Sequence, residues 1–364
     1  MRIALVVPGG VDRSGEIRVI PALLALIARL ALRHDVHVFA LNQEDEPAEW
    51  RLAGAQVHNI GRRRTRLRAL SAIRRLHGLA PFAVVHAIWS GTCGLVAVAA
   101  ARLLRVPSLI HIAGGELVSM PDIAFGGRLT LRGRVREQLV LHAASVITAA
   151  SAPVIRALSE LGLTAQRVPL GVDLHAWPRR EPVRRCGGTA RLIHVASLNQ
   201  VKDQLTLLRA MAALLATGMS VEMDIVGEDT LHGQIEAIAA NLGLGEHVRF
   251  HGFLPQRHLR PLVEAADVMV VTSRHEAGPL VVLEAAVAGV PTVGTAVGHI
   301  AEWAPEAALA VPVGDWNGLA QTLHRLLEDE DLRLRIAREA SKRALREDAD
   351  FSADAFQLLY RGLV

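Results

Sequence analysis

Short apolar runs alternate with longer amphipathic segments along almost the whole chain, and this alternation limits the possible folds more than any other feature. Runs such as Ile3–Val7 and Val221–Val226 have the length and composition of buried strands, and the segments between them carry the period of helices. Strands separated by helices form parallel sheets with helices on both faces. The sequence therefore predicts an α/β fold with doubly wound, Rossmann-like sheets.

The alternation is interrupted once. From Trp177 to Gly188 the sequence has no period and contains several prolines and glycines, which indicates a linker. We expect two Rossmann-like domains, at residues 1–175 and 187–345, and a last helix within 346–364 that crosses back to the first domain. The first helix is predicted at residues 16–32. Strands are predicted at Ile3–Val7, Val36–Ala40, Ala83–His86, Ser108–Ile112, Ser145–Thr148, Leu192–Ala196, Val221–Val226, Val248–His251, Val268–Val271 and Thr292–Val293.

Composition excludes several classes of protein. The 364 residues are 51% hydrophobic and 21% charged, as in globular proteins. Aromatic residues make up 4%, which argues against a stacking surface for single-stranded nucleic acid. Cys93 and Cys186 lie far apart, so we expect no disulfide and a reducing compartment. The N-terminus lacks the apolar core of a signal peptide, and the stretch Ala285–Ala301 is broken by glycines and a proline, so we expect a cytoplasmic protein without a membrane span.

The glycine-bearing loop after the first strand resembles two known phosphate sites without matching either. Gly10 and Gly15 have the spacing of a P-loop, but Glu16 occupies the position of its lysine, so an ATPase is not expected. No GxGxxG follows the first strand, which argues against a nicotinamide cofactor there. Ligands of such folds bind at the carboxyl ends of parallel strands, so the loop remains a candidate binding site. An equal alternative is that it is a plain strand-to-helix turn without a ligand.

Charged segments elsewhere have plainer interpretations. The acidic triplets at residues 329–331 and 348–350 fit solvated helix faces, so we predict no metal and no cofactor. The segment Arg62–Arg75 carries seven arginines and no acid, with an apolar stripe at every third residue from Leu67 to Leu76. Such a helix packs its stripe on its own sheet or lies on anionic lipid at the inner face of the membrane. We favour the surface helix and keep peripheral membrane contact as the alternative.

The most informative stretch runs from Ser273 to Thr295. Glu276 follows a predicted strand, Pro279 suits the first turn of the next helix, and Glu284 falls within that helix. A helix N-terminus presents free N–H groups that suit a diphosphate. The carboxylate of Glu284 can accept both hydroxyls of a ribose, and that of Glu276 can reach hydroxyls of a sugar. The pattern therefore indicates a site for a nucleotide-diphosphate sugar.

Two carboxylates beside a diphosphate require a cation, and Lys202 is the candidate. Lys202 and Lys342 are the only lysines in an arginine-rich chain, and Lys202 follows the strand Leu192–Ala196. Parallel strands place it at the same sheet edge as Glu276. Gly227 follows the predicted strand Val221–Val226, and because glycine has no side chain, the backbone there can lie close to a phosphate. Ser273 and His275 in the same segment could suggest a hydrolase with a serine nucleophile. No GxSxG motif surrounds Ser273, so we do not expect nucleophilic catalysis by this serine.

Six motifs in order resemble the glycosyl transferases group 1, which are retaining glycosyltransferases of the GT-B fold. Glu276 and Glu284 stand with seven residues between them, and Ala285 to Val293 match AxxxGxPxV. The other matching segments are the glycine loop at residues 9–15, AGGE at 113–116, PLGVD at 169–173, ASLNQVKD at 196–203 and VRFHGFLP at 248–255. The resemblance implies two Rossmann-like domains facing each other across a cleft, with the donor bound by the second domain and the acceptor by the first.

The resemblance also implies roles for individual residues. Glu276 would contact the transferred sugar, with His111 as a second catalytic candidate, and catalysis would need no metal. The donor would be bound by Ser197, Lys202, Gly227, Phe253, Leu254, Ala277, Gly278, Pro279, Leu280 and Glu284. The acceptor side would include Gly9, Gly10, Gly15, Gly114, Gly115 and Glu116. The expected partners are a nucleotide-sugar donor and a carbohydrate or lipid-linked acceptor, and no nucleic acid.

The chain departs from the family pattern at three positions. Ser197 replaces a phosphate-binding arginine, for which Arg274 is a candidate substitute, and Leu170 replaces an asparagine. Ala113 replaces a histidine near the sugar; His111, on the same strand face, is either a substitute or a buried structural residue. These departures leave two alternatives open: a non-catalytic nucleotide-sugar-binding subunit, and a non-hydrolysing sugar-nucleotide epimerase. The epimerase would need its own carboxylates and histidine in the first domain, and the sequence does not reveal them.

Overall fold

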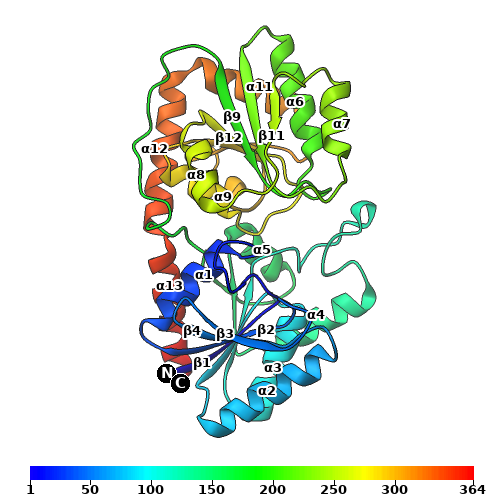
Figure 1. Cartoon of the computed structure of the whole chain (residues 1–364), viewed down its shortest axis with the longest axis vertical. Helices are drawn as coiled ribbons and strands as arrows, with labels where there is room; N and C mark the ends of the chain where they lie inside the picture. The colour runs from blue at the N-terminus through cyan, green and yellow to red at the C-terminus, as the bar shows by residue number, and fades with distance from the viewer. The chain divides into compact units, whose positions relative to one another are not determined.

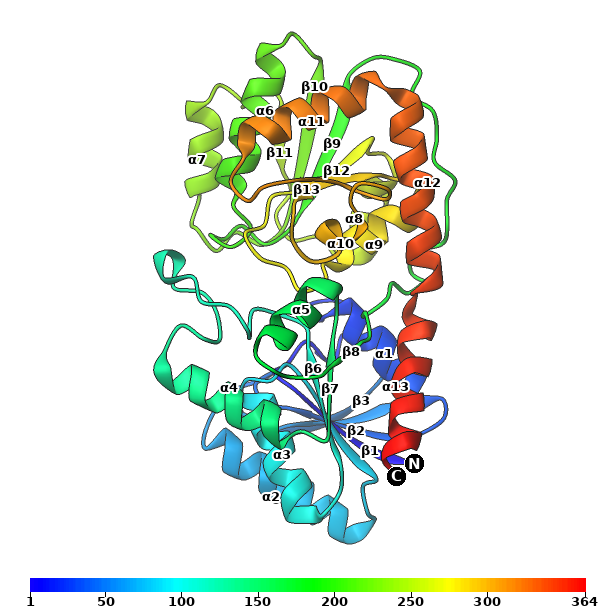
Figure 2. The same ribbon diagram turned by 180° about the vertical axis from the view of Figure 1, so that it is seen from behind.

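A computed structural model describes all residues from Met1 to Val364. The chain divides into two compact units, and each contains one sheet, mainly parallel in unit 1 and wholly parallel in unit 2 (Figures 1 and 2). Unit 1 comprises Met1–Asp173 and Glu347–Val364, and unit 2 comprises Leu174–Arg346. The predicted α/β class with two Rossmann-like sheets is confirmed.

Unit 1 contains an eight-stranded sheet in the order β3-β4-β2-β1-β5-β6-β7-β8. Every neighbouring pair is parallel except β3 and β4. Helices α1 and α13 cover one face of the sheet, and α2, α3 and α4 lie on the other (Figures 1 and 2). The strands are β1 Arg2–Val7, β2 Asp35–Ala40, β3 Ala48–Leu52, β4 Ala55–Asn59, β5 Val84–Ile88, β6 Ser108–Ile112, β7 Val146–Ala149 and β8 Gln166–Arg167. The helices are α1 Pro21–Ala31, α2 Thr65–Leu79, α3 Thr92–Leu104, the 3₁₀ turn η1 Pro121–Ile123, α4 Leu131–Ala143, α5 Ala152–Glu160 and α13 Ala349–Leu363.

The last helix, α13, belongs to the core of unit 1. The Phe356 and Tyr360 side chains are fully buried, and the Tyr360 hydroxyl lies 2.6 Å from His86 Nδ1 on β5. Arg29 on α1 contacts Asp173 at 3.0 Å and Asp350 at 2.5 Å. Arg29 is itself mostly buried, and its charge-assisted hydrogen bonds fasten α13, through Asp350, and the segment after β8, through Asp173, to α1.

Unit 2 contains a six-stranded, wholly parallel sheet in the order β11-β10-β9-β12-β13-β14. Its strands are β9 Ala190–Val195, β10 Val221–Val226, β11 Val248–Phe250, β12 Val268–Val271, β13 Thr292–Thr295 and β14 Leu309–Val311. Its helices are α6 Gln204–Ala216, α7 Gln234–Asn241, α8 Gln256–Glu264, α9 Leu280–Val287, α10 Gly298–Trp303, α11 Trp316–Glu328 and α12 Glu330–Arg346. The predicted linker at 177–188 has no regular structure.

One prediction about unit 1 was wrong in detail, and one structural feature was missed. The helix predicted at residues 16–32 begins only at Pro21, because residues 8–20 form a loop closed by a bridge between Val11 and Val19. The hairpin of β3 and β4 was not predicted, since β3 (AEWRL) is polar and has no fully buried position.

The arginine-rich segment forms α2, which begins at Thr65 and packs on unit 1 through Ala69, Ile73 and Leu76. The predicted apolar stripe was wrong at Leu67, whose side chain is 67% exposed. A helix repeats every 3.6 residues, so positions spaced by three gradually rotate away from the buried face. No helix in the structure combines the length and the apolar character that crossing a bilayer requires.

Replacing Gly171 by alanine should destabilise unit 1 strongly. A Cβ atom at this position would lie 2.1 Å from the Asp348 carbonyl carbon, where the chain enters α13. We expect a loss of about 2 kcal/mol or more of unfolding free energy, as is typical of overpacking, measured by urea unfolding. Gly78→Ala is the matched control: nothing lies within 4 Å of its Cβ position, so it should be neutral or mildly stabilising in helix α2. Equal stability of the two variants would contradict the packing described for α13.

Candidate functional site

The centre of the site in unit 2 is an ion pair between Lys202 and Glu276. Lys202 Nζ lies 2.5 Å from Glu276 Oε1, and the Ser273 hydroxyl donates to the same oxygen at 2.6 Å. Both charged side chains are largely buried, with 26% and 14% exposed, so solvent screens the pair only partly. The structure thus brings the predicted cation to the predicted sugar-contacting carboxylate.

Backbone contacts hold these two loops together. The Thr272 hydroxyl donates to the Lys202 carbonyl oxygen at 2.9 Å, and the Arg274 N–H donates to the Val201 carbonyl oxygen at 2.7 Å. Asn199 Oδ1 accepts hydrogen bonds from the N–H groups of Val201 and Lys202, which fixes the turn before α6. The position of Lys202 is therefore set by the fold of the loop as well as by the ion pair.

Helix α9 begins at Leu280, shortly after Glu276, without a capping side chain. Its N-cap is Pro279, which makes no side-chain cap hydrogen bond, and the Val282 N–H donates to the Pro279 carbonyl oxygen at 3.2 Å. The preceding N–H groups of the first turn suit an anion. Ala277 and Pro279 are buried, and Gly278 and Leu280 are partly exposed. Gly298 fits against this loop: a Cβ there would lie 2.8 Å from Pro279 Cδ and 3.1 Å from Glu276 Cβ. The approach of α10 thus limits where the Glu276 loop can lie.

Glu284 lies on α9 and is almost wholly buried, at 2% exposed. Gln256 Nε2 donates to Glu284 Oε1 at 3.0 Å, and Trp177 Nε1 donates to Gln256 Oε1 at 2.6 Å. Burial raises the pKa of Glu284 to about 7, although the hydrogen bonds from Gln256 and Trp177 oppose the shift. Sequence reasoning missed Gln256 and Trp177, since Trp177 comes from the segment interpreted only as a linker.

The remaining donor candidates lie at the carboxyl ends of β9, β10 and β11. Gly227 packs so closely that a Cβ would lie 1.9 Å from the Ala196 carbonyl oxygen, and its N–H donates to Gly252 at 2.9 Å. Ser197 is exposed, and its carbonyl oxygen accepts from the Gln204 side chain at 3.2 Å. Phe253 is 53% exposed and is followed by the partly buried Leu254. The Phe253 ring is therefore open to solvent.

His111, the second catalytic candidate, lies inside unit 1. It is fully buried on β6, and its Nδ1 is 2.9 Å from the Thr148 hydroxyl oxygen. Phe356 of α13 packs edge-on against its ring, and burial lowers its pKa to about 3. In this structure the ring has no surface with which to contact a sugar, which fits the structural interpretation of His111.

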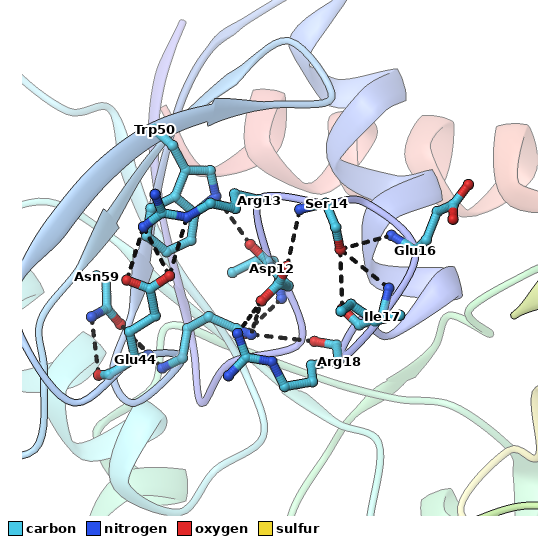
Figure 3. A network of polar contacts seen from close by, with 11 residues as sticks. Asp12, Arg13, Ser14, Glu16, Ile17, Arg18, Glu44, Trp50 and Asn59 are labelled. Carbon is cyan, nitrogen blue, oxygen red and sulfur yellow. Dashed lines mark hydrogen bonds and ion pairs between the residues drawn. The ribbon is translucent and has the colours of Figure 1, made fainter. Parts of the chain in front are cut away.

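The predicted glycine loop, which includes Gly9, Gly10 and Gly15, is fastened by polar contacts (Figure 3). The buried Asp12 accepts from the Ser14 N–H at 3.0 Å and pairs with Arg18. Arg13 contacts both carboxylate oxygens of Glu44, at 2.8 and 2.9 Å. Trp50 Nε1 donates to the Val11 carbonyl oxygen at 3.1 Å. This loop connects β1 to α1 and is held by contacts within unit 1, which are compatible both with a ligand site and with a plain strand-to-helix turn.

The AGGE segment follows β6 in the same unit. Glu116 is 9% exposed; its Oε1 accepts from the Ser90 N–H at 3.3 Å, and its Oε2 has no partner. A Cβ at Gly114 would lie 3.0 Å from Trp89 Nε1 and 3.1 Å from Glu116 Oε2, and a Cβ at Gly115 would lie 2.4 Å from the Phe125 ring. Burial raises the pKa of Glu116.

The comparisons with known proteins agree with this architecture. The family model of glycosyl transferases group 1 matches residues 179–343, and that of the glycosyl transferase 4-like domain matches residues 19–171. The chain is similar to a D-inositol 3-phosphate glycosyltransferase of Corynebacterium urealyticum, with 32% identity over 178 residues. That match covers 46% of this chain and 42% of the relative, so the chain spans less than half of its length.

Two solved structures share the fold over the whole chain. Sucrose-phosphate synthase from Thermosynechococcus elongatus has a TM-score of 0.83 and 18% identity, covering 100% of this chain and 99% of the other. Anabaena Alr3699/HepE, solved in complex with UDP and glucose, has a TM-score of 0.77 and 19% identity, covering 100% of both chains. The fold is therefore GT-B, and the chain belongs to the glycosyl transferases group 1 family.

The buried carboxyl of Glu284 should make stability fall as pH rises. Its pKa is about 7 in the fold, above the ordinary value of 4.5, so the native protein keeps a proton that the unfolded chain releases. Relative to Glu284→Gln, wild-type unfolding free energy should fall by roughly 3 kcal/mol between pH 4.5 and 7 and then level off. Urea unfolding across this range measures the difference. The exposed Glu246→Gln serves as control and should follow wild type; parallel curves for wild type and Glu284→Gln would refute the shifted pKa.

Proposed function

We propose that the chain transfers a sugar from a nucleotide-diphosphate sugar to an acceptor hydroxyl with retention of anomeric configuration, in the synthesis of a glycan, glycolipid or polysaccharide. The observation that carries this proposal is the Lys202–Glu276 pair beside the uncapped N-terminus of α9. A cation and free N–H groups suit a diphosphate, and a carboxylate next to them suits sugar hydroxyls.

Each donor residue has a part in this scheme. Lys202 and the first N–H groups of α9 bind the diphosphate, and Glu284 accepts the ribose hydroxyls. Glu276 accepts hydroxyls of the transferred sugar, while Ser273 and Lys202 hold its carboxylate in place. These contacts orient the anomeric carbon toward the acceptor.

The bond changes are simple. The bond between the anomeric carbon and the diphosphate oxygen breaks, and the bond to the acceptor oxygen forms on the same face. The acceptor proton passes to an oxygen of the leaving diphosphate. The negative charge that develops on this leaving group is stabilised by Lys202 and the N-terminus of α9.

The acceptor is proposed to be a carbohydrate, free or linked to lipid. Two of the similar proteins are named after phosphorylated compounds, D-inositol 3-phosphate and sucrose phosphate. A lipid-linked acceptor would bring the arginine-rich segment 62–75 close to an anionic membrane surface, and the protein would then act as a cytoplasmic, peripheral enzyme.

The two alternatives predict different products. A non-catalytic subunit, favoured by the exposed Ser197 at the family's arginine position, would bind nucleotide and form no glycosidic bond. An epimerase would return an altered nucleotide sugar without an acceptor. Product analysis by NMR after incubation with donor and acceptor separates all three, and it also reports whether the anomeric configuration is retained.

Glu276→Gln should lower kcat by about 100-fold or more while nucleotide affinity changes little, because the lost charge acts on the sugar in the transition state. The measurement pairs steady-state kinetics with a thermal-shift titration of UDP, GDP, ADP, dTDP and CMP, which identifies the base through stabilisation of the native state. In Glu284→Ala, by contrast, the nucleotide should no longer raise the melting temperature. Normal turnover in Glu276→Gln would reject the assigned role and favour a binding protein.

A further inference from the structure

A cavity of about 830 Å³ lies in unit 1, at the carboxyl ends of its central strands. Pro8 and Leu41 follow β1 and β2, Trp89 follows β5, and Thr92 begins α3. The segment 62–67 before and at the start of α2 closes another side. Ligands of doubly wound folds bind at this edge of the sheet, so the position itself is suitable for a substrate.

The charge of the cavity wall is unbalanced. Arg62, Arg64 and Arg66 line it, and no Asp or Glu is among its lining residues. Arg62 pairs with Asp45 at 2.8 Å, but neither Arg64 nor Arg66 has an acidic partner. A second cavity, of about 860 Å³ in unit 2, differs: its arginines lie among Glu328, Asp329, Glu330 and Asp331, and Arg184 pairs with Asp331 at 2.5 Å. Of these two cavities, only the one in unit 1 has arginines without acidic residues in its lining.

The N-terminus of α3 adds to this charge. Its N-cap is Gly91, no side chain caps it, and both Gly91 and Thr92 line the cavity. The free N–H groups of the first turn carry a partial positive charge. Two unpaired guanidinium groups and a helix terminus on one cavity suit a phosphate or carboxylate group.

Trp89 supplies an aromatic wall held in a strained conformation. Its φ is +74°, a value that is uncommon for a bulky residue. The Trp89 N–H donates to the His111 carbonyl oxygen at 2.8 Å, and Gly114 packs against the indole. Strained residues cluster at ligand sites, where surrounding contacts enforce them. A partly exposed indole offers an apolar surface for the ring of a sugar or cyclitol.

We propose that this cavity binds the acceptor and that the acceptor carries an anionic group, a phosphate or carboxylate, held by Arg64 and Arg66. The inference rests on the proposed transferase function and names the acceptor class for it. The anionic group comes either from a small soluble acceptor or from a lipid headgroup, because the same guanidinium groups bind both.

The test uses inorganic phosphate, glucose 6-phosphate and vesicles of phosphatidylglycerol with the full-length protein. The double variant Arg64→Gln/Arg66→Gln removes the proposed ligands. Arg74→Gln/Arg75→Gln removes the same charge from exposed positions on α2 that do not line the cavity. All four side chains are exposed, so both variants should fold, which circular dichroism checks.

Isothermal titration should show glucose 6-phosphate binding that weakens about 10-fold or more in Arg64→Gln/Arg66→Gln and is unchanged in Arg74→Gln/Arg75→Gln. That result identifies a soluble acceptor. Selective loss of vesicle binding in the first variant, with weak glucose 6-phosphate binding, identifies a lipid headgroup. Phosphate and vesicle binding that is the same in both variants would overturn the proposal.

Nucleotide binding separates this inference from the proposed function. Arg64→Gln/Arg66→Gln should keep the thermal shift with the donor nucleotide, since the donor residues lie in unit 2. Anion binding at the cavity without any nucleotide binding in wild type would refute the transferase and leave the anion site standing. Nucleotide binding without anion binding would refute only the anionic acceptor.

Discussion

The ion pair between Lys202 and Glu276 is the interaction on which the site of unit 2 depends. It joins the loop after β9 to the loop after β12, two neighbouring strands of one parallel sheet. The carboxyl ends of neighbouring parallel strands lie at the same edge of the sheet, so the loops that follow β9 and β12 lie next to each other. In the absence of donor, the pair keeps both charges compensated in a largely buried place, where an isolated charge would be costly. In the proposed function, the same lysine binds the donor diphosphate.

Close backbone approaches make this geometry rigid. Gly227 leaves no room for a Cβ beside Ala196, and Gly298 packs against the Glu276 loop and Pro279. The hydrogen bonds from Thr272 and Arg274 to the Lys202 loop add to this restraint. A site held on several sides keeps its groups in a reactive arrangement before substrate binds, which lowers the ordering cost of binding.

Sequence periodicity predicted much of the fold because buried parallel strands are short and apolar. Ser108–Ile112, Val221–Val226 and Val268–Val271 have the predicted bounds. The polar strand β3 carries no such signal, and the late start of α1 depends on the bridge between Val11 and Val19. The closeness of Lys202 to Glu276 follows from their shared sheet edge. The Trp177–Gln256–Glu284 contacts join segments far apart in the sequence, so no local pattern reveals them.

The most direct test of the account is the affinity of Lys202→Gln for the nucleoside, nucleoside monophosphate and nucleoside diphosphate of the base found by the thermal-shift screen. Isothermal titration should show diphosphate binding weakened by about 10-fold, as expected for one lost charge-assisted hydrogen bond, with nucleoside binding unchanged. Lys342→Gln, an exposed lysine on α12, is the matched control and should bind like wild type. Diphosphate affinity unaffected in Lys202→Gln, or an equal loss for all three ligands, would contradict the assignment of Lys202 to the donor diphosphate.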